Sequence, residues 1–365
     1  MIFAFAGKTI ACLVWVFWMM IADNSVMGQD NNSISLEYKP TYGTTYDRVI
    51  ARGYVICGTN DEFPGFSEEI FDHPEGLQMV GFDVDICKAV AAAVFGDSDS
   101  IQYEIIDGFT RFTSLSEGSI DILSAATTYT FTRNVLKRFE FLPTTYYDGQ
   151  GFITKRTLGV SSAKQMHGAK ICFAGSGTAA KNIADFMELH EIKYIPVNVG
   201  EDENTRDVYL RGDCDMYGTD RSGLASNRLG FNNPELHMIL PEIISKEPLG
   251  PVVKYGDQKW SDIVRWTVYV LFIAEEMGIN SKNIDTFKNS IDPNVQRFMG
   301  EKNGADHPHL GAKLGLTETW SYDIIKQVGN YREIFTRNII EKLGLKRGLN
   351  KLYRDGGLLY SPPLK

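Results

Sequence analysis

Apolar residues between positions 55 and 126 follow helix and strand periods in turn. Ile86, Val90 and Val94 are spaced as on one face of a helix, and the neighbouring segments alternate or form short apolar runs, as buried strands do. The predicted order is strand, helix, strand, helix and strand, over Val55–Thr59, Phe82–Phe95, Ile101–Ile106, Arg111–Glu117 and Ile120–Ala126. Strands that alternate with helices in this way predict an α/β fold with a parallel sheet.

A second copy of this order begins after Lys155. Its predicted elements are Lys170–Ala174, Thr178–His190, Tyr194–Val199, Asn204–Leu210 and a strand within the segment GDCDMYGTD that starts at Gly212. This segment repeats the GSID of the first copy, with Asp215 in the place of Asp121. Such internal similarity predicts two lobes of related architecture.

The chain then returns to the first lobe. The segment LPEIISKEPLGP, residues 240–251, is rich in Pro and Gly and leads into an amphipathic helix over Ser261–Gly278. We therefore expect two crossings, near Gly151 and near Gly250, with a cleft between the lobes. The first lobe is predicted to hold residues 47–151 and 250–365, and the second lobe residues 152–249.

The amino terminus has the features of a secretory signal. Lys8 precedes an apolar run from Thr9 to Ala22, and a small and polar sequence follows it, with Val26 and Gly28 at the −3 and −1 positions before Gln29. The alternative is an uncleaved anchor, although the run is shorter than the roughly 18 apolar residues of a spanning helix. We predict a signal peptide over residues 1–28 and a flexible linker over 29–46.

Composition narrows the class of protein. The 365 residues are 43% hydrophobic and 23% charged, which is typical of a soluble protein large enough for two cores. A net charge of −9, without a stripe of Lys and Arg, argues against nucleic-acid binding. The cysteines that follow the signal are spaced unlike any zinc motif, and their even number permits three disulfide pairings; they are Cys57, Cys87, Cys172 and Cys214.

Hydroxyl and cationic side chains follow the last strand of the first copy. Thr127, Thr128, Thr130 and Thr132 supply four hydroxyls, and Arg133 adds a planar guanidinium that can bind a carboxylate through two hydrogen bonds. Loops past the carboxyl ends of strands hold the ligands of α/β folds. The alternative is that the threonines cap a helix and Arg133 is a solvated surface charge.

The matching strand of the second copy ends in a carboxylate, Asp220. In the same lobe, the turn GSGT contains Ser176 and opens the helix at Thr178, whose free N–H groups favour an anion. An α-carboxylate shared by Arg133, Thr128 and this helix end, with Asp220 on the α-ammonium, would hold a zwitterion. The alternative for Asp220 is a helix N-cap.

Several blocks of this sequence resemble the periplasmic solute-binding protein of the general L-amino-acid ABC transporters, within the polar amino-acid binding group. The blocks are GFDVDICKAVAAAVFG, RFTSLSEGSIDIL, TYYDGQGF, LPEIISKEPLGP, DIVRWTVYVLFIAEEMGI and VGNYREIF. The resemblance extends from about Arg52 to the carboxyl terminus. It implies a two-lobe periplasmic-binding-protein fold, of the type II flytrap with two crossing strands and a central ligand cleft.

The resemblance also implies roles for single residues. It places the carboxylate-binding Arg at Arg133 with Thr128 as hydroxyl partner, and the ammonium-binding Asp at Asp220. Its aromatic pocket walls would be Phe63 and Phe66, for which a core position is the alternative. Arg111 falls where the group contacts the ligand side chain, so polar or acidic amino acids are the expected preference; the alternative is that Arg111 extends over the lobe surface.

The sequence departs from the group at two points. Thr178 is followed by Ala179 and Ala180 where close relatives have further threonines, and Ala125 and Ala126 replace two serines of the wider group. Backbone groups are the candidates to replace the missing hydroxyls.

We expect the cysteines to pair within the lobes, Cys57 with Cys87 and Cys172 with Cys214, because a bond between lobes would oppose hinge motion. The implied function is binding of L-α-amino acids and delivery to an inner-membrane ABC permease by a periplasmic monomer without a cofactor. Two alternatives are a dehydratase-like enzyme on the same fold and a ligand-sensing domain. The six histidines lie outside the predicted cleft strands, which argues against the enzyme.

Overall fold

The computed structural model describes residues 44–71, 78–201, 203–300 and 309–365. The predicted signal peptide, and the predicted linker up to residue 43, lie outside these ranges. Within them, no helix combines the length and the apolar character that crossing a membrane requires.

One five-stranded sheet is the centre of what we call the first lobe. Its order is β5-β1-β6-β15-β7, in which β1 pairs in parallel with β5 and β6, and β15 pairs antiparallel with β6 and β7. The strands are β1 (Val55–Thr59), β5 (Ile101–Ile105), β6 (Ile122–Leu123), β7 (Phe139–Phe141) and β15 (Val252–Lys254).

A second five-stranded sheet is the centre of the second lobe. Its order is β11-β10-β12-β9-β13, and its first three strands are parallel while β9 pairs antiparallel with β12 and β13. The strands are β9 (Gln150–Lys155), β10 (Lys170–Ala174), β11 (Ile195–Val199), β12 (Met216–Asp220) and β13 (His237–Ile239). The parallel strands occupy the same relative positions in both sheets.

Two strands connect the lobes. β8 (Tyr146–Asp148) leads directly into β9, and β14 (Glu247–Leu249) leads back into β15. The two pair antiparallel, with Glu247 opposite Asp148. Each lobe therefore completes its sheet with a strand that follows a crossing.

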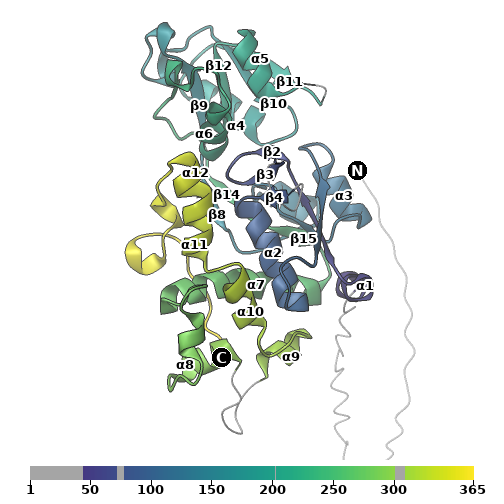
Figure 1. The fold of residues 1–365 in the computed structure, drawn as a ribbon. Coiled ribbons are helices and arrows are strands. Elements are labelled where there is room, and N and C mark those ends of the chain that lie inside the picture. Colours follow the sequence, from purple (N-terminus) through teal and green to yellow (C-terminus); the bar gives the residue numbers. More distant parts are fainter. Residues whose placement is uncertain (1–43, 72–77, 202, 301–308) are drawn as a thin grey trace, which may run out of the picture. The chain divides into compact units, whose positions relative to one another are not determined.

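Helices cover the sheets, and their apolar faces form the cores. α2, α7 and α10 pack against one another in the first lobe, while α4, α5 and α6 pack on the second sheet (Figure 1). The helices are α1 (Thr44–Arg52), α2 (Phe82–Phe95), α3 (Arg111–Glu117), α4 (Ala179–Leu189), α5 (Thr205–Arg211), α6 (Arg221–Leu229), α7 (Gln258–Met277), α8 (Pro293–Met299), α9 (Leu310–Leu314), α10 (Trp320–Gln327), α11 (Tyr331–Phe335) and α12 (Glu341–Leu343). A small sheet of β2 (Glu62–Phe63), β3 (Ser67–Ile70) and β4 (Gln78–Val80) adjoins α2.

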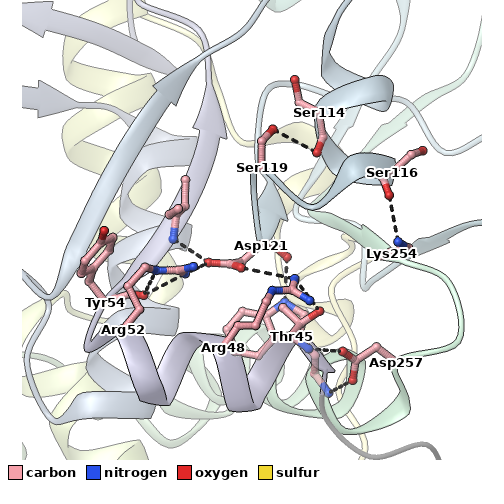
Figure 2. Close-up of polar contacts among 12 residues, drawn as sticks. Thr45, Arg48, Arg52, Tyr54, Ser114, Ser116, Ser119, Asp121, Lys254 and Asp257 are labelled. Carbon is pink, nitrogen blue, oxygen red and sulfur yellow. Dashed lines mark hydrogen bonds and ion pairs between the residues drawn. The ribbon is translucent and has the colours of Figure 1, made fainter.

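The repeated aspartate makes the same backbone contact in both lobes. The Asp121 carboxylate accepts a hydrogen bond from the Ile56 N–H at 2.8 Å, and the Asp215 carboxylate accepts one from the Lys170 N–H at 2.8 Å. Figure 2 shows that Asp121 also binds Arg52, which brings α1 against the strands. The internal repeat is therefore a repeat of structure as well as of sequence.

Two disulfides lie within the lobes. Cys57 on β1 is bonded to Cys87 on α2, with 6.2 Å between the Cα atoms, and Cys172 on β10 is bonded to Cys214, which precedes β12, with 5.8 Å between them. These are the two pairs expected from the sequence.

The predicted elements differ from the observed ones mainly at their ends. α1 begins at Thr44, so the predicted linker over 29–46 extends three residues too far; the Asp257 carboxylate accepts a hydrogen bond from the Thr45 N–H and fixes this turn. The predicted strand Ile120–Ala126 is regular only over β6, because the chain bends at Ala126, where φ is 42°. The sequence did not predict β2, β3 and β4.

Candidate ligand-binding site

A cavity of about 270 Å³ lies between residues of the two lobes. Seven of the eight residues predicted from the sequence line it: Phe63, Arg111, Thr128, Arg133, Ser176, Thr178 and Asp220. A second hollow of about 640 Å³ adjoins it, because Asn60, Gly108, Ser176 and Thr219 line both. A residue with a Cβ at position 108 would collide with the Ser176 hydroxyl, so glycine allows the lobes to approach here.

Arg133 is a buried cation on the first-lobe wall of the cavity. Its side chain is 7% exposed, its Nη1 donates to the Thr128 carbonyl oxygen at 2.8 Å, and its guanidinium lies 5.2 Å from the centre of the Phe112 ring. Among the described residues, no carboxylate forms an ion pair with it. Burial lowers the pKa of Arg133, and Glu247 and Asp220 oppose this shift. The solvated surface position considered for Arg133 is therefore wrong.

Arg111 lies on the same wall. Its guanidinium is 5.5 Å from the centre of the Phe112 ring, and its Nε is buried without a hydrogen-bond acceptor. Burial, followed by repulsion from Arg133, lowers the pKa of Arg111 to about 10, so the side chain stays charged at neutral pH. Two guanidinium groups thus share one ring and line one cavity.

Asp83, which was not predicted as a site residue, holds the loop that carries Thr128. Its buried carboxylate accepts hydrogen bonds from the Ala126 N–H at 2.7 Å and from the Ser124 hydroxyl at 3.1 Å. Burial raises the pKa of Asp83 to about 6, against these hydrogen bonds. The Ala126 N–H is therefore occupied, so it is not the backbone group expected to replace a hydroxyl here. The sequence signal for Asp83 was the GFDVD segment at the start of α2.

Asp220 ends β12 on the opposite wall. It occupies the N-cap position of α6, yet its carboxylate makes no capping hydrogen bond. Burial raises the pKa of Asp220 well above its ordinary value, and repulsion from Asp148 and Glu247 adds to this, whereas Arg111 and Arg133 oppose it. Its position is that of a helix cap, but its side chain does not act as one.

Thr178 is the N-cap residue of α4 and likewise makes no side-chain cap. Its hydroxyl donates to the Glu247 carboxylate at 3.3 Å, and the Asn182 amide donates to the same carboxylate at 2.7 Å. Glu247 is 2% exposed and comes from the crossing strand β14. A residue that the sequence did not single out thus connects the crossing to the start of α4.

The two predicted aromatic walls differ. Phe63 lines the cavity, but Phe66 does not, because it is 1% exposed and packs in the core of the first lobe against Phe82 and Tyr146. The Phe63 and Phe66 rings stack, with centroids 4.7 Å apart. Phe66 therefore supports Phe63 from behind, which is the core position considered as its alternative.

The histidines of the described residues are placed away from this chemistry. None of them lines the cavity or the adjoining hollow. His237 is buried in the second lobe, where its Nδ1 and the Tyr209 hydroxyl are 2.7 Å apart. The arrangement of two cations, one anion and several hydroxyls suits the binding of a small charged molecule.

Comparisons with known proteins agree with this geometry. The model of the bacterial extracellular solute-binding proteins, family 3, matches residues 55–299. The general L-amino acid-binding periplasmic protein of Rhizobium johnstonii is 46% identical over 325 residues, which are 88% of this chain and 93% of that protein. The glutamate/glutamine/aspartate/asparagine-binding protein of Rhodobacter capsulatus is 44% identical over 325 residues, or 88% and 94% of the two chains.

A solved structure is similar over nearly the whole length. The ABC transporter periplasmic binding protein from Brucella ovis, with glutathione bound, has a TM-score of 0.84 and 40% identity, and the match covers 89% of this chain and all of that one. The two lobes, the two crossing strands and the cavity between them are thus those of a periplasmic binding protein of the type II flytrap. The chain belongs to the bacterial extracellular solute-binding proteins of family 3.

Proposed function

We propose that the mature protein binds free L-α-amino acids in the cavity between Arg133 and Asp220 and delivers them to an ABC importer. The observation that carries this proposal is that a buried guanidinium and a carboxylate line the same cavity, and that in the described part of the chain the first has no carboxylate partner and the second makes no capping contact. A zwitterion supplies the missing partner of each. Two relatives at 46% and 44% identity are named for binding amino acids.

Arg133 and Thr128 bind the α-carboxylate in this proposal, and Asp220 binds the α-ammonium. The free N–H groups at the start of α4, with Ser176 and Thr178 beside them, add to the carboxylate site, since a helix N-terminus favours negative charge. Charge-assisted hydrogen bonds of this kind are about twice as strong as neutral ones.

Arg111 would set a preference among side chains. A second guanidinium in the cavity, whose Nε has no hydrogen-bond acceptor among the described residues, favours ligands with acceptor side chains, Glu, Asp, Gln and Asn, over Lys and Arg. The Rhodobacter capsulatus relative is named for binding these four amino acids.

Glutathione is a second candidate ligand, because the Brucella ovis relative holds it and the adjoining hollow offers room beyond an amino acid. Its γ-glutamyl end carries a free α-ammonium and α-carboxylate, so the same contacts serve. However, the hollow is lined by Asp61, Glu62, Asp107, Glu201 and Glu203 and by no Lys or Arg. These carboxylates repel the glycine carboxylate of glutathione, so free amino acids are the favoured class.

The test is calorimetric titration of the mature protein after removal of co-purified ligand, with a panel of L-amino acids and glutathione. We expect heat of binding with several L-amino acids, the acidic and amide ones first, and none with a D-enantiomer at the same concentration. No heat and no thermal shift with any member would overturn the proposal.

The remaining assignments complete this proposal. The signal is cleaved before Gln29, and the product works in the periplasm as a monomer that docks on an inner-membrane permease. Because β9 of the second sheet begins at Gln150, the first crossing between the lobes is β8 rather than residue 151. The relatives of the protein are named as binding proteins rather than enzymes, and we expect the ligand to be recovered unchanged after incubation with the protein.

A further inference from the structure

Three carboxylates meet where the crossing strands reach the second lobe. Asp148 ends β8 and faces Glu247 of β14 directly across the antiparallel pair, and Asp220 ends the neighbouring strand β12. Like charges opposite each other on paired strands repel, and here Glu247 is 2% exposed while Asp148 is half-buried. Such a cluster needs compensation.

Hydrogen bonds stabilise the negative charge of two members. Asp148 accepts from the N–H groups of Gly149 at 2.8 Å and Ser222 at 3.1 Å. Glu247 accepts from Asn182 at 2.7 Å, Ser245 at 2.6 Å and Thr178 at 3.3 Å. Asp220 stands at the N-cap position of α6, but its carboxylate accepts no capping hydrogen bond there. Asp220 is therefore the member least able to carry its charge alone.

The positive charges near Asp220 are fewer than the carboxylates of the cluster. The groups that interact with it come from β8, β14, α3, the turn over Thr132–Leu136, and β12; they are Asp148, Glu247, Arg111, Arg133, Tyr146 and Tyr217. With all carboxylates ionised, three negative charges stand against two guanidinium groups, which leaves one negative charge in excess in a buried site. Asp220 is compensated locally either by a proton or by a ligand ammonium in contact with it, whereas the α-carboxylate of the ligand pairs with Arg133 in the proposed site.

We propose that amino-acid binding is proton-linked, because Asp148 and Glu247 keep a proton on Asp220 in the free protein and the ligand ammonium displaces it. The O–H proton of Asp220 leaves to solvent, and the carboxylate then accepts N–H hydrogen bonds from the ammonium. This inference rests on the proposed function and assigns Asp148 and Glu247 as positioning residues of that site. Burial and the neighbouring carboxylates, which raise the pKa of Asp220, agree with it.

The sign of the linkage follows from this exchange. Below the pKa of Asp220 in the free protein, binding must expel a proton, so affinity falls by up to about tenfold for each unit that the pH is lowered. Above that pKa, Asp220 is already ionised and the affinity is independent of pH on this account. The opposite slope would contradict the proposal.

Calorimetric titration with L-glutamate in two buffers that both buffer at the working pH but differ in ionisation enthalpy, phosphate and imidazole, measures the proton directly. We expect heats that differ between the buffers by the release of up to one proton per ligand, increasing as the pH is lowered. Equal heats in both buffers over the acidic and neutral range would overturn the proposal, although amino-acid binding itself would stand. No heat with any ligand would overturn the proposed function instead.

Two variants on different strands locate the source of the proton. Glu247→Gln and Asp148→Asn each remove one negative neighbour of Asp220 and should move the onset of proton release to lower pH. Asp185→Asn is the matched control, because Asp185 is exposed on α4 and pairs only with Lys181 at 3.1 Å. Proton release that stays unchanged in both cluster variants would overturn the assignment to this cluster.

Discussion

The two lobes place their strands in the same order but present opposite charges to the cavity. In the first, the loop after β6 carries Thr128 and Arg133; in the second, the strand β12 ends at Asp220. β6 and β12 hold equivalent places, each beside the first parallel strand of its sheet. The shared strand order thus fixes where the functional groups stand. The residues at or after the ends of β6 and β12 decide which charge each lobe presents to the cavity.

The lobes also differ in how deeply the shared aspartate is buried. Asp121 is 2% exposed and is surrounded by Arg52, the Ile56 N–H and, at 3.9 Å, Arg48, whereas Asp215 lies exposed at the surface of the second lobe. The first lobe adds α1 and the helices after α7 to its core. The same contact therefore has different energetic importance in the two lobes.

Removing either charged wall should have the largest effect. Arg133→Ala and Asp220→Ala each leave the opposite ligand charge desolvated and unpaired, at a cost of about 2–5 kcal/mol, or roughly 30-fold to several-thousand-fold in affinity. Calorimetric titration with L-glutamate checks this. Arg156→Ala, at an exposed side chain of the second lobe, is the matched control and should bind normally. An Arg133→Ala or Asp220→Ala protein with unchanged affinity would place the site elsewhere.

Removing one disulfide at a time tests whether each bond stabilises its own lobe. The bonds close loops of 30 and 42 residues, and the loop-entropy model gives about 3–4 kcal/mol of stability for each. We expect Cys57→Ala with Cys87→Ala, and Cys172→Ala with Cys214→Ala, to lower the melting temperature by similar amounts. Peptide mapping without reductant should recover the two pairs; free thiols at these positions or a pair between lobes would refute the expectation.

Substituting the shared aspartate in each lobe tests whether its burial determines its contribution to the free energy of unfolding. Asp121→Ala leaves the Ile56 N–H and Arg52 without their buried acceptor, which costs about 1–3 kcal/mol of unfolding free energy. Asp215→Ala should cost less than about 1 kcal/mol, because water can reach the Lys170 N–H at the surface. Denaturant unfolding of the two variants measures both. Equal losses would show that burial does not distinguish the contacts.

The spacing of apolar residues was enough to predict the bounds of elements that have a continuous apolar face or run. The bounds of α2, α3, β1 and β10 are those predicted, because each has a continuous apolar face or run between turn residues. The repeat of GSID by GDCD located the second lobe, and the residues that follow its strands predicted Thr128, Arg133 and Asp220 as site residues. The resemblance to a known family added Phe63 and Arg111, which also line the cavity.

The sequence was less informative where tertiary contacts decide the structure. Phe63 and Phe66 are equivalent in sequence terms, and only tertiary packing, in which the Phe66 ring contacts Phe82 of α2, places one ring in the cavity and the other in the core.

The roles of Asp83 and Glu247 depend on partners that lie 41 to 69 residues away along the chain, beside the local contact of Glu247 with Ser245. The GFDVD segment by itself therefore did not mark Asp83 as a site residue.

The preference among amino acids is a separate effect from the overall affinity, and Arg111 is the residue that tests it. Arg133 and Asp220 act on every α-amino acid, so a preference must come from groups that meet the side chain, and Arg111 brings a charged group into the cavity with its Nε unpaired. Because its pKa is lowered only to about 10, Arg111 remains a cation at neutral pH and can bind an acceptor side chain.

A hydrogen bond to a charged group contributes about 1.5–3 kcal/mol, so Arg111→Ala should weaken the binding of L-glutamate by roughly tenfold or more relative to L-leucine. Competition titrations with the two ligands measure this ratio, and Arg111→Lys, which keeps the charge but not the planar fork, should fall between the variant and the natural protein. Equal losses for the two ligands would mean that Arg111 supports Phe112 and the wall of the cavity without contacting the ligand side chain.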